Sequence, residues 1–187
     1  MLAALPLILA VHAPTAAQIA KQLSREAHRC AGKLTLTGDG VGAVRVGSSV
    51  EAVRKACHVP VRKLRKGDAP PPANLLELKI GPTPVQAEIA GGHVWRVIVD
   101  GGALRTLDRI GVDSPLSAVL ATGGARANQT EGVTYATNAA NCGVAFALDY
   151  KPRRGEDRDN WTAEGLARLP PDTKVGRVLM SGCRPGR

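Results

Sequence analysis

Aromatic side chains are scarce in this sequence. Phe, Trp and Tyr together make up 3% of the 187 residues: two Trp, two Tyr and one Phe. The core must therefore be filled mainly by Val, Leu, Ile and Ala, and a dry binding groove lined by aromatic rings is not expected.

A catalytic or cofactor-binding motif is lacking too. The glycine-rich passage 38–47 has Arg45 where the dinucleotide-binding pattern requires its third glycine. We accordingly expect no cofactor.

The N-terminal apolar run is too short to cross a bilayer, which requires about 20 residues in a helix. It spans residues 2–11, contains no charged side chain and is followed by small residues. This pattern predicts a signal peptide over residues 1–17, whereas the alternative is a buried N-terminal segment. No cysteine follows the run closely enough for lipid attachment, because the first one is Cys30. We expect a soluble periplasmic or secreted protein without a transmembrane span in its mature form.

The four cysteines form an even set, which in an exported chain predicts two disulfides. Cys142 begins one expected strand and Cys183 follows the next, so antiparallel pairing brings these two together. Cys30 and Cys57 each end an expected helix, and a disulfide between them would hold the two helices together. The alternative is a zinc site in which His28 and His58 join the first two cysteines. Adjacent Cys and His ligands suit tetrahedral zinc poorly, so we expect no metal.

Helical and strand-like spacings follow one another along the first half of the chain. Residues 18–31 carry apolar side chains at helical spacing, and the Ser48-to-Glu51 spacing is that of a capping box at a second helix start. Apolar and polar residues then alternate over 76–80 and 85–89, which predicts two half-buried strands. The glycine pair 91–92 predicts a tight hairpin turn into a third strand.

The second half shows the same order. Ser114 and the proline after it predict a helix start, and strands are expected over 132–137, 143–148 and 175–180. The sequence therefore predicts an α+β fold: two tandem units, each a helix with a three-stranded antiparallel meander, with the helices packed on one sheet face, plus an N-terminal helix. The first unit, with that helix, spans 18–100, and the second, with a long inserted loop at 150–174, spans 101–187.

The segments VGSSVEAVRKACHVP and IGVDSPLSAVLATGG, each followed by a meander, resemble the repeat unit of two families of exported bacterial proteins. One is the SmpA/OmlA type of outer-membrane assembly lipoprotein, and the other is the β-lactamase inhibitory protein type. The resemblance covers residues 37–181 as architecture. It implies the fold and a non-enzymatic class of function, and no functional residue is carried over from it.

Two segments are candidates for binding. The loop 150–174 holds Trp161 together with Arg153, Arg154 and Arg158, and Trp and Arg are the side chains that most often anchor interfaces. The alternative is that Trp161 packs against the core. The basic stretch 54–66 contains no acidic residue, and its alternative is a solvated surface. Its six basic residues are Arg54, Lys55, Arg62, Lys63, Arg65 and Lys66.

The net charge of +9 favours anionic partners. We expect an exported, non-catalytic binding or inhibitory module of the bacterial envelope, whose partner is an envelope protein or an anionic envelope polymer. Nucleic acid is not expected, because stacking aromatics are missing near the basic stretch. The alternative is a small exported hydrolase or envelope-polymer-modifying enzyme, in which residues such as Asp39, Asp108 and His93 converge only in the folded chain.

Overall fold

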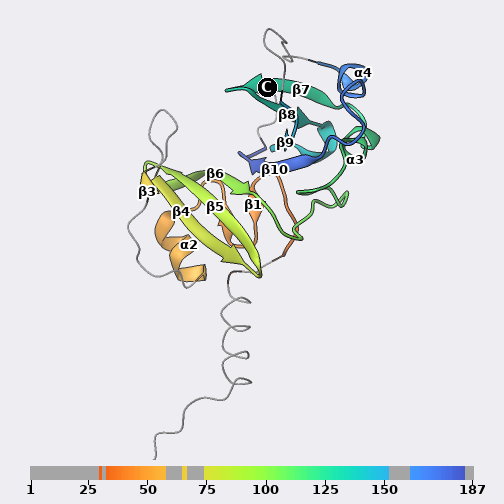
Figure 1. Cartoon of the computed structure of the whole chain (residues 1–187). Helices are drawn as coiled ribbons and strands as arrows, with labels where there is room; N and C mark the ends of the chain where they lie inside the picture. Colours follow the sequence, from red (N-terminus) through yellow and green to blue (C-terminus); the bar gives the residue numbers. More distant parts are fainter. Residues whose placement is uncertain (1–29, 31–32, 58–64, 67–73, 152–160, 184–187) are drawn as a thin grey trace, which may run out of the picture.

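The computed structural model describes residues 30, 33–57, 65–66, 74–151 and 161–183. One antiparallel sheet of eight strands dominates this part of the chain, in the order β3-β4-β5-β6-β10-β9-β8-β7. A separate sheet of two strands, β1 and β2, precedes it (Figure 1). The sheet thus consists of two meanders, β3 to β6 and β7 to β10, which meet where β6 pairs with β10.

The strands of the two sheets have the following bounds: β1 Gly40–Val41, β2 Val44–Arg45, β3 Arg65–Lys66, β4 Asn74–Ile80, β5 Thr83–Ala90, β6 His93–Val99, β7 Arg126–Thr130, β8 Val133–Thr137, β9 Val144–Leu148 and β10 Val175–Met180. The helices are α2 Val50–Cys57, α3 Leu116–Ala121 and α4 Ala163–Leu166, with a 3-10 turn η1 at Ala139–Asn141. In the described part of the chain no helix is both long and apolar enough to span a membrane.

The expected α+β fold with two tandem units of a helix and three strands is wrong. The described part of the protein is mostly β: one continuous sheet contains both meanders, each with four strands, and the helices in this part are only 8, 6 and 4 residues long. Such short helices cannot form a helical layer over eight strands. The main reason for the error is β7, whose residues RANQT place a single buried side chain, Ala127, on the core face and so show no apolar alternation. The predicted signal peptide and, apart from Cys30, the predicted N-terminal helix lie outside the described residues.

The core lies against one face of the eight-stranded sheet. Alternating side chains of the strands, such as Leu78, Val85 and Val97, are buried there. Short elements cover them: α2 contributes Val53, α3 and α4 contribute further apolar residues, and the β1–β2 hairpin contributes its valines. Figure 1 shows α2 beside the β4–β6 end of the sheet and α3 and α4 beside the other end. Aliphatic side chains and a single phenylalanine, Phe146, thus fill the core, as the composition predicts.

Both helix starts differ by one residue from the positions expected from the sequence. The cap of α2 is Ser49, whose Oγ accepts a hydrogen bond from the backbone N–H of Ala52 at 3.1 Å. Ser48 instead pairs through its backbone oxygen with the N–H of Val94. The cap of α3 is Pro115, whose ring has no hydrogen-bond acceptor, and the Oγ of Ser114 accepts from the N–H of Gly111. Ser48 thus lies in a strand-like backbone contact and Ser114 in a local turn, so neither serine is the cap that the pattern predicted.

Both expected disulfides are formed. Cys30 is bonded to Cys57, and Cys142 to Cys183, and no free cysteine occurs among the described residues. The second pair follows from the register, because Met180 of β10 faces Val144 of β9 and so brings the cysteines to the same edge of the sheet. The close approach there has no room for a side chain: a Cβ on Gly38 would lie 1.9 Å from the carbonyl oxygen of Cys142.

Candidate functional site

A β-bulge in β6 places Trp95 on the face of the sheet opposite the core, here called the open face. Glu88 of β5 faces Arg96, but the next residue, Ile89, faces Val94, so Trp95 is an extra residue on β6. A bulge redirects a side chain that regular alternation would place elsewhere. Trp95 is 41% exposed, whereas Val94 and Val97 on either side of the bulge are buried in the core.

The Trp95 ring is held by an ion pair next to it. The guanidinium carbon of Arg96 lies 4.5 Å from the centre of the indole ring, within the range of a cation–π contact. The Arg96 guanidinium in turn donates two hydrogen bonds to the Glu88 carboxylate, from Nε to Oε2 at 2.7 Å and from Nη2 to Oε1 at 3.0 Å. The Glu88 side chain is only 8% exposed, so this two-pronged contact is sheltered from water. The three side chains form a fixed platform.

An apolar strip continues from this platform across the middle of the open face. In the sheet register Ile98 of β6 faces Leu179 of β10, which faces Ala145 of β9. One row further, Ala147 of β9 faces Tyr135 of β8. These residues belong to a second hydrophobic cluster, separate from the core, whose members are side chains of sheet strands. Ile98, Ala147 and Leu179 are buried, at 5%, 5% and 7% exposed, whereas Tyr135 and Ala145 are half-buried. Strand spacing makes the strip from β6 to β8 about 14 Å wide.

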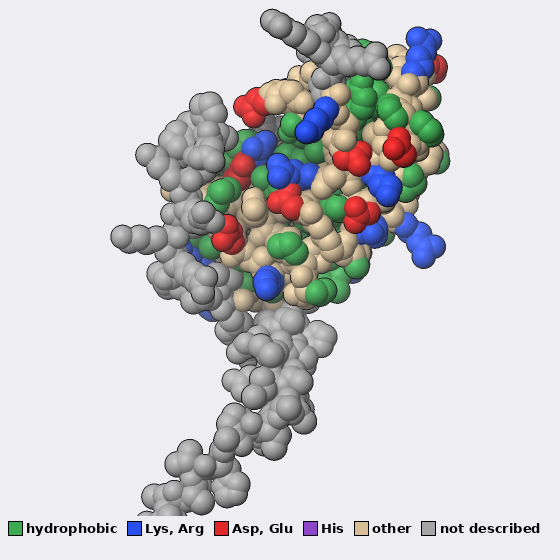
Figure 2. All heavy atoms as spheres, viewed as in Figure 1, with side chains coloured by type: hydrophobic (Ala, Val, Ile, Leu, Met, Phe, Trp, Pro, Cys, Tyr) green, Lys and Arg blue, Asp and Glu red, His purple; other side chains and the backbone are tan. Residues whose placement is uncertain are grey.

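Charged side chains border this strip. At one side lies the Glu88–Arg96 pair, and at the other Arg177 of β10 forms an ion pair with Asp100, just after β6. Acidic and basic side chains are likewise interspersed with apolar ones on the face of the molecule that Figure 2 shows, and they are not gathered by sign there. Paired charges of both signs around a small, largely buried apolar cluster fit a protein-binding surface better than a polyanion groove.

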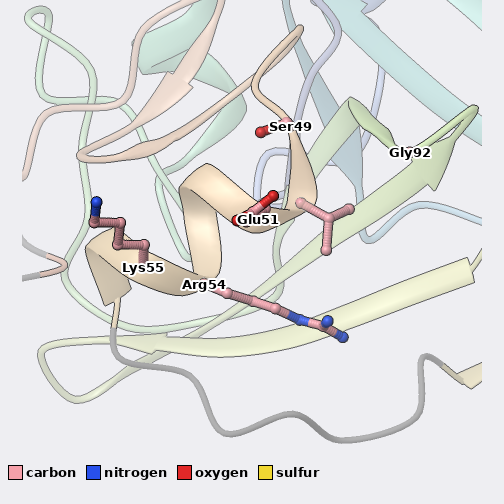
Figure 3. Close-up of a pocket in the computed structure, with 6 residues that line it drawn as sticks. Ser49, Glu51, Arg54, Lys55 and Gly92 are labelled. Atoms are coloured by element: carbon pink, nitrogen blue, oxygen red, sulfur yellow. The ribbon is translucent and has the colours of Figure 1, made fainter.

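A hollow of about 790 Å³ lies between the first turns of α2 and the tip of the β5–β6 hairpin. Ser49, Val50, Glu51, Arg54, Lys55 and Gly92 line it. The backbone N–H of Val50 donates to the carbonyl of Gly92 at 3.0 Å and fixes the helix to the hairpin. In Figure 3 the side chains of Arg54 and Lys55 leave α2 in different directions. The hollow therefore presents charges of both signs rather than a focused cationic site.

The structure describes only part of the basic stretch. Arg54 and Lys55 line the hollow, and Arg65 and Lys66 form β3 at the edge of the sheet, paired with Leu75 and Asn74 of β4. Arg62 and Lys63 lie outside the described residues. Through the register, Lys66, Asn74, Ile89 and Val94 lie in one row across four strands, so both ends of the stretch belong to the same end of the sheet.

Of the four candidate binding residues in the loop 150–174, the structure describes Trp161, whereas Arg153, Arg154 and Arg158 lie outside the described residues. Trp161 is half-buried, packs against the core cluster, and accepts a hydrogen bond through its backbone oxygen from Ala127 of the edge strand β7. A Cβ on Gly165 would lie 2.9 Å from its ring. These contacts favour the packing alternative for Trp161. Nearby, a hydrogen bond from Thr162 lowers the pKa of the exposed Glu164 carboxyl.

The residues considered for catalysis are each engaged elsewhere. The Asp39 carboxylate accepts from the backbone N–H of Cys183, Asp108 accepts from the Asn141 side chain at 3.0 Å, and His93 Nδ1 lies 3.0 Å from the carbonyl oxygen of Gly91. No hydrogen bond in the described residues joins any two of the three. Nor does that part of the chain contain a group of three or more His, Cys, Asp or Glu side chains suited to a metal.

The sequence has no match among protein-family models, and no curated protein matches it. The fold does have a solved counterpart, the crystal structure of the uncharacterized protein YfeY from Escherichia coli. The two chains superpose with a TM-score of 0.53 at 15% sequence identity, over 79% of this chain and 99% of the other. At this identity the likeness extends to the fold alone.

Sequence reasoning missed the Trp95 platform. Its signal was present in the run VWRVIV, where the first two valines are three positions apart and so cannot share a face of a regular strand. Val94 and Val97 are nevertheless both buried in the core, which only a bulge allows. An irregular spacing between apolar residues of a strand thus indicates a bulge, and the residues between them are candidates for exposure.

Proposed function

We propose that the chain is an exported, non-catalytic binding module of the bacterial envelope, periplasmic or secreted, which holds a protein partner on the open face of its sheet. Trp95 is the anchor of this interface, and the accessible part of the strip is its half-buried side chains, Ala145 and Tyr135. The partner is an envelope protein that presents a complementary apolar surface with a polar border.

The observation that carries this proposal is the exposed Trp95 held in place by the Arg96–Glu88 pair. Ordering a flexible side chain costs binding free energy, and a ring that is already fixed avoids most of that cost. Trp and Arg are also the residues that most often account for the binding energy of interfaces. The two disulfides support an oxidising compartment, where such bonds persist.

Site-specific photocrosslinking in cells that export the full chain tests the proposal. A photoreactive residue at Gln86, which faces Ile98 on the open face, is expected to form one discrete adduct with a protein. The same residue at Leu107, which is 85% exposed on a turn outside the sheet, is expected not to form this adduct.

Affinity measurements with the purified partner then test the anchor. Trp95→Ala is expected to weaken binding about 30-fold, the effect of losing a hot-spot side chain worth about 2 kcal/mol. Leu107→Ala serves as the matched control, because it removes another exposed apolar side chain outside the sheet. Equal loss in both variants, or none in Trp95→Ala with the fold intact, would contradict the proposed interface.

A further inference from the structure

The Arg96 guanidinium has a second edge that Glu88 does not use. A guanidinium can bind a carboxylate through two parallel N–H groups, either between Nε and Nη2 or between Nη1 and Nη2. Glu88 occupies the first of these edges, because Nε donates to Oε2 and Nη2 donates to Oε1. Among the described residues no group accepts a hydrogen bond from Nη1, and Nη1 is not a buried atom. The second edge is therefore accessible to solvent, and the Arg96 side chain keeps 26% of its surface exposed.

This open edge lies next to the Trp95 ring. The guanidinium carbon, to which Nη1 is bonded, is 4.5 Å from the centre of the indole ring. An oxygen that accepts from Nη1 at about 2.9 Å is accordingly within about 9 Å of the ring centre. Trp95 is 41% exposed, so the part of the ring that Arg96 does not cover can contact an apolar side chain. One small patch thus offers a pair of donors and an apolar surface side by side.

A carboxylate is the group that fits the open edge best. Its two oxygens accept from both N–H groups at once, whereas a backbone carbonyl offers one oxygen. The Glu88 carboxylate repels a second anion, but the guanidinium is closer to each carboxylate than they are to one another. Because the Coulomb energy falls with distance, the attraction outweighs the repulsion. The net charge of +9 acts in the same direction, and a cationic group would be repelled.

We propose that the element of the partner protein that binds Trp95 is an acidic, extended segment. Its carboxylate pairs with the open edge of Arg96, and an apolar side chain two positions away packs on the Trp95 ring. Side chains at that spacing lie on the same face of an extended chain, about 7 Å apart. This inference rests on the proposed function and adds the chemistry of the partner. Arg96 both fixes the ring and selects partners by charge.

Titration of the isotope-labelled, exported protein with short peptides tests the proposal by NMR spectroscopy. The probe is acetyl-Gly-Leu-Ser-Glu-Gly-amide, in which the Glu carboxylate is the single charge, and the matched control has Gln in place of Glu. We expect the Trp95 indole N–H and Arg96 Nε–H signals to shift saturably with the acidic peptide at millimolar concentration. These signals are identified by their loss in Trp95→Phe and Arg96→Lys. The Gln peptide is expected to bind about fivefold more weakly, since it lacks the charge and one acceptor.

Substitutions separate the Arg96 edge from the general charge of the protein. Arg96→Lys keeps a cation opposite Glu88 but has no second edge, so the acidic peptide should lose its advantage over the Gln peptide while thermal melts still show a folded protein. Arg126→Lys makes the same exchange on β7, four strands away from β6, and should leave the selectivity unchanged. The proposal is overturned if the acidic peptide causes no shift, if the parent protein binds both peptides equally, or if the two substitutions have equal effects.

The photocrosslink at Gln86 distinguishes this inference from the proposed function. An adduct whose crosslinked segment has no acidic residue would keep the proposed interface and refute the acidic segment. Selective binding of the acidic peptide without any protein adduct would do the reverse, because the site would then stand without an envelope protein as its partner.

Discussion

The disulfide between Cys142 and Cys183 is expected to contribute more stability than the one between Cys30 and Cys57. The first closes a loop with a sequence separation of 41 and the second one of 27. In the chain-entropy model these loops correspond to about 4 and about 3.5 kcal/mol, because a longer closed loop removes more conformations from the unfolded chain. Replacing either pair by serines should lower the free energy of unfolding by that amount.

Local contacts keep the native geometry when the Cys142–Cys183 bond is removed. The N–H of Gly182 donates to the carbonyl of Gly38 at 2.9 Å, and the N–H of Ser181 donates to the carbonyl of Gly143 at 3.0 Å. These bonds hold the end of β10 against the start of β9 without the sulfur atoms. The loss of stability should therefore arise in the unfolded state, and the folded spectrum should not change.

Urea unfolding of the two double-serine variants, followed by circular dichroism, measures both losses. A domain of this kind has about 5 to 15 kcal/mol of stability, so removing both bonds is expected to take away about half of it or more. A loss below about 1 kcal/mol for the Cys142–Cys183 pair would refute the reasoning. A larger loss for the Cys30–Cys57 pair would refute the dependence on loop length.

Three further changes test the packing of the sheet. Phe146→Ala removes a fully buried ring and should cost about 3 to 5 kcal/mol of unfolding free energy in urea; a smaller loss would mean that the core collapses around the gap. Gly38→Ala should cost about 1 to 3 kcal/mol, whereas Gly101→Ala, with open space around its Cβ, should be nearly neutral, and equal effects would contradict the close approach. Glu88→Ala breaks the sheltered ion pair and should lower stability by about 1.5 to 3 kcal/mol in thermal melts; an unchanged melt would contradict this.

Strong periodicity made part of the fold predictable. The alternation over 76–80 and 85–89 and the glycine pair 91–92 correspond to β4, β5 and the hairpin turn in the structure. The expected strands at 143–148 and 175–180 correspond to β9 and β10, and their antiparallel pairing gave the cysteine pair at the sheet edge. In β4 burial alternates along the strand, so its sequence carries a period of two, whereas β9 and β10 are buried on both faces over most of their length and are short apolar runs.

The rest depends on contacts that have no local signal. The edge strand β7 pairs with one neighbour and buries one alanine, so it needs few apolar residues. The helical spacing near residues 116–120 does mark a helix, but α3 is only six residues long. It therefore does not supply the layer of helices that the predicted α+β fold requires. The candidate site was missed for a related reason, because the exposure of Trp95 follows from a bulge set by the partner strand β5. Composition alone pointed to the loop around Trp161, a residue that packs against the core cluster in the structure.

The junction between the two meanders is short, since β6 and β10 face each other through only three residue pairs, from Val97 with Met180 to Val99 with Val178. The segment around β1 and β2 bridges this junction, with Gly47 bonded to Val94 of β6 and Gly38 to Gly182 beyond β10. We therefore expect hydrogen exchange to show two cooperative units, one for each meander, that open separately. The bridging segment should open before the two meanders separate from each other.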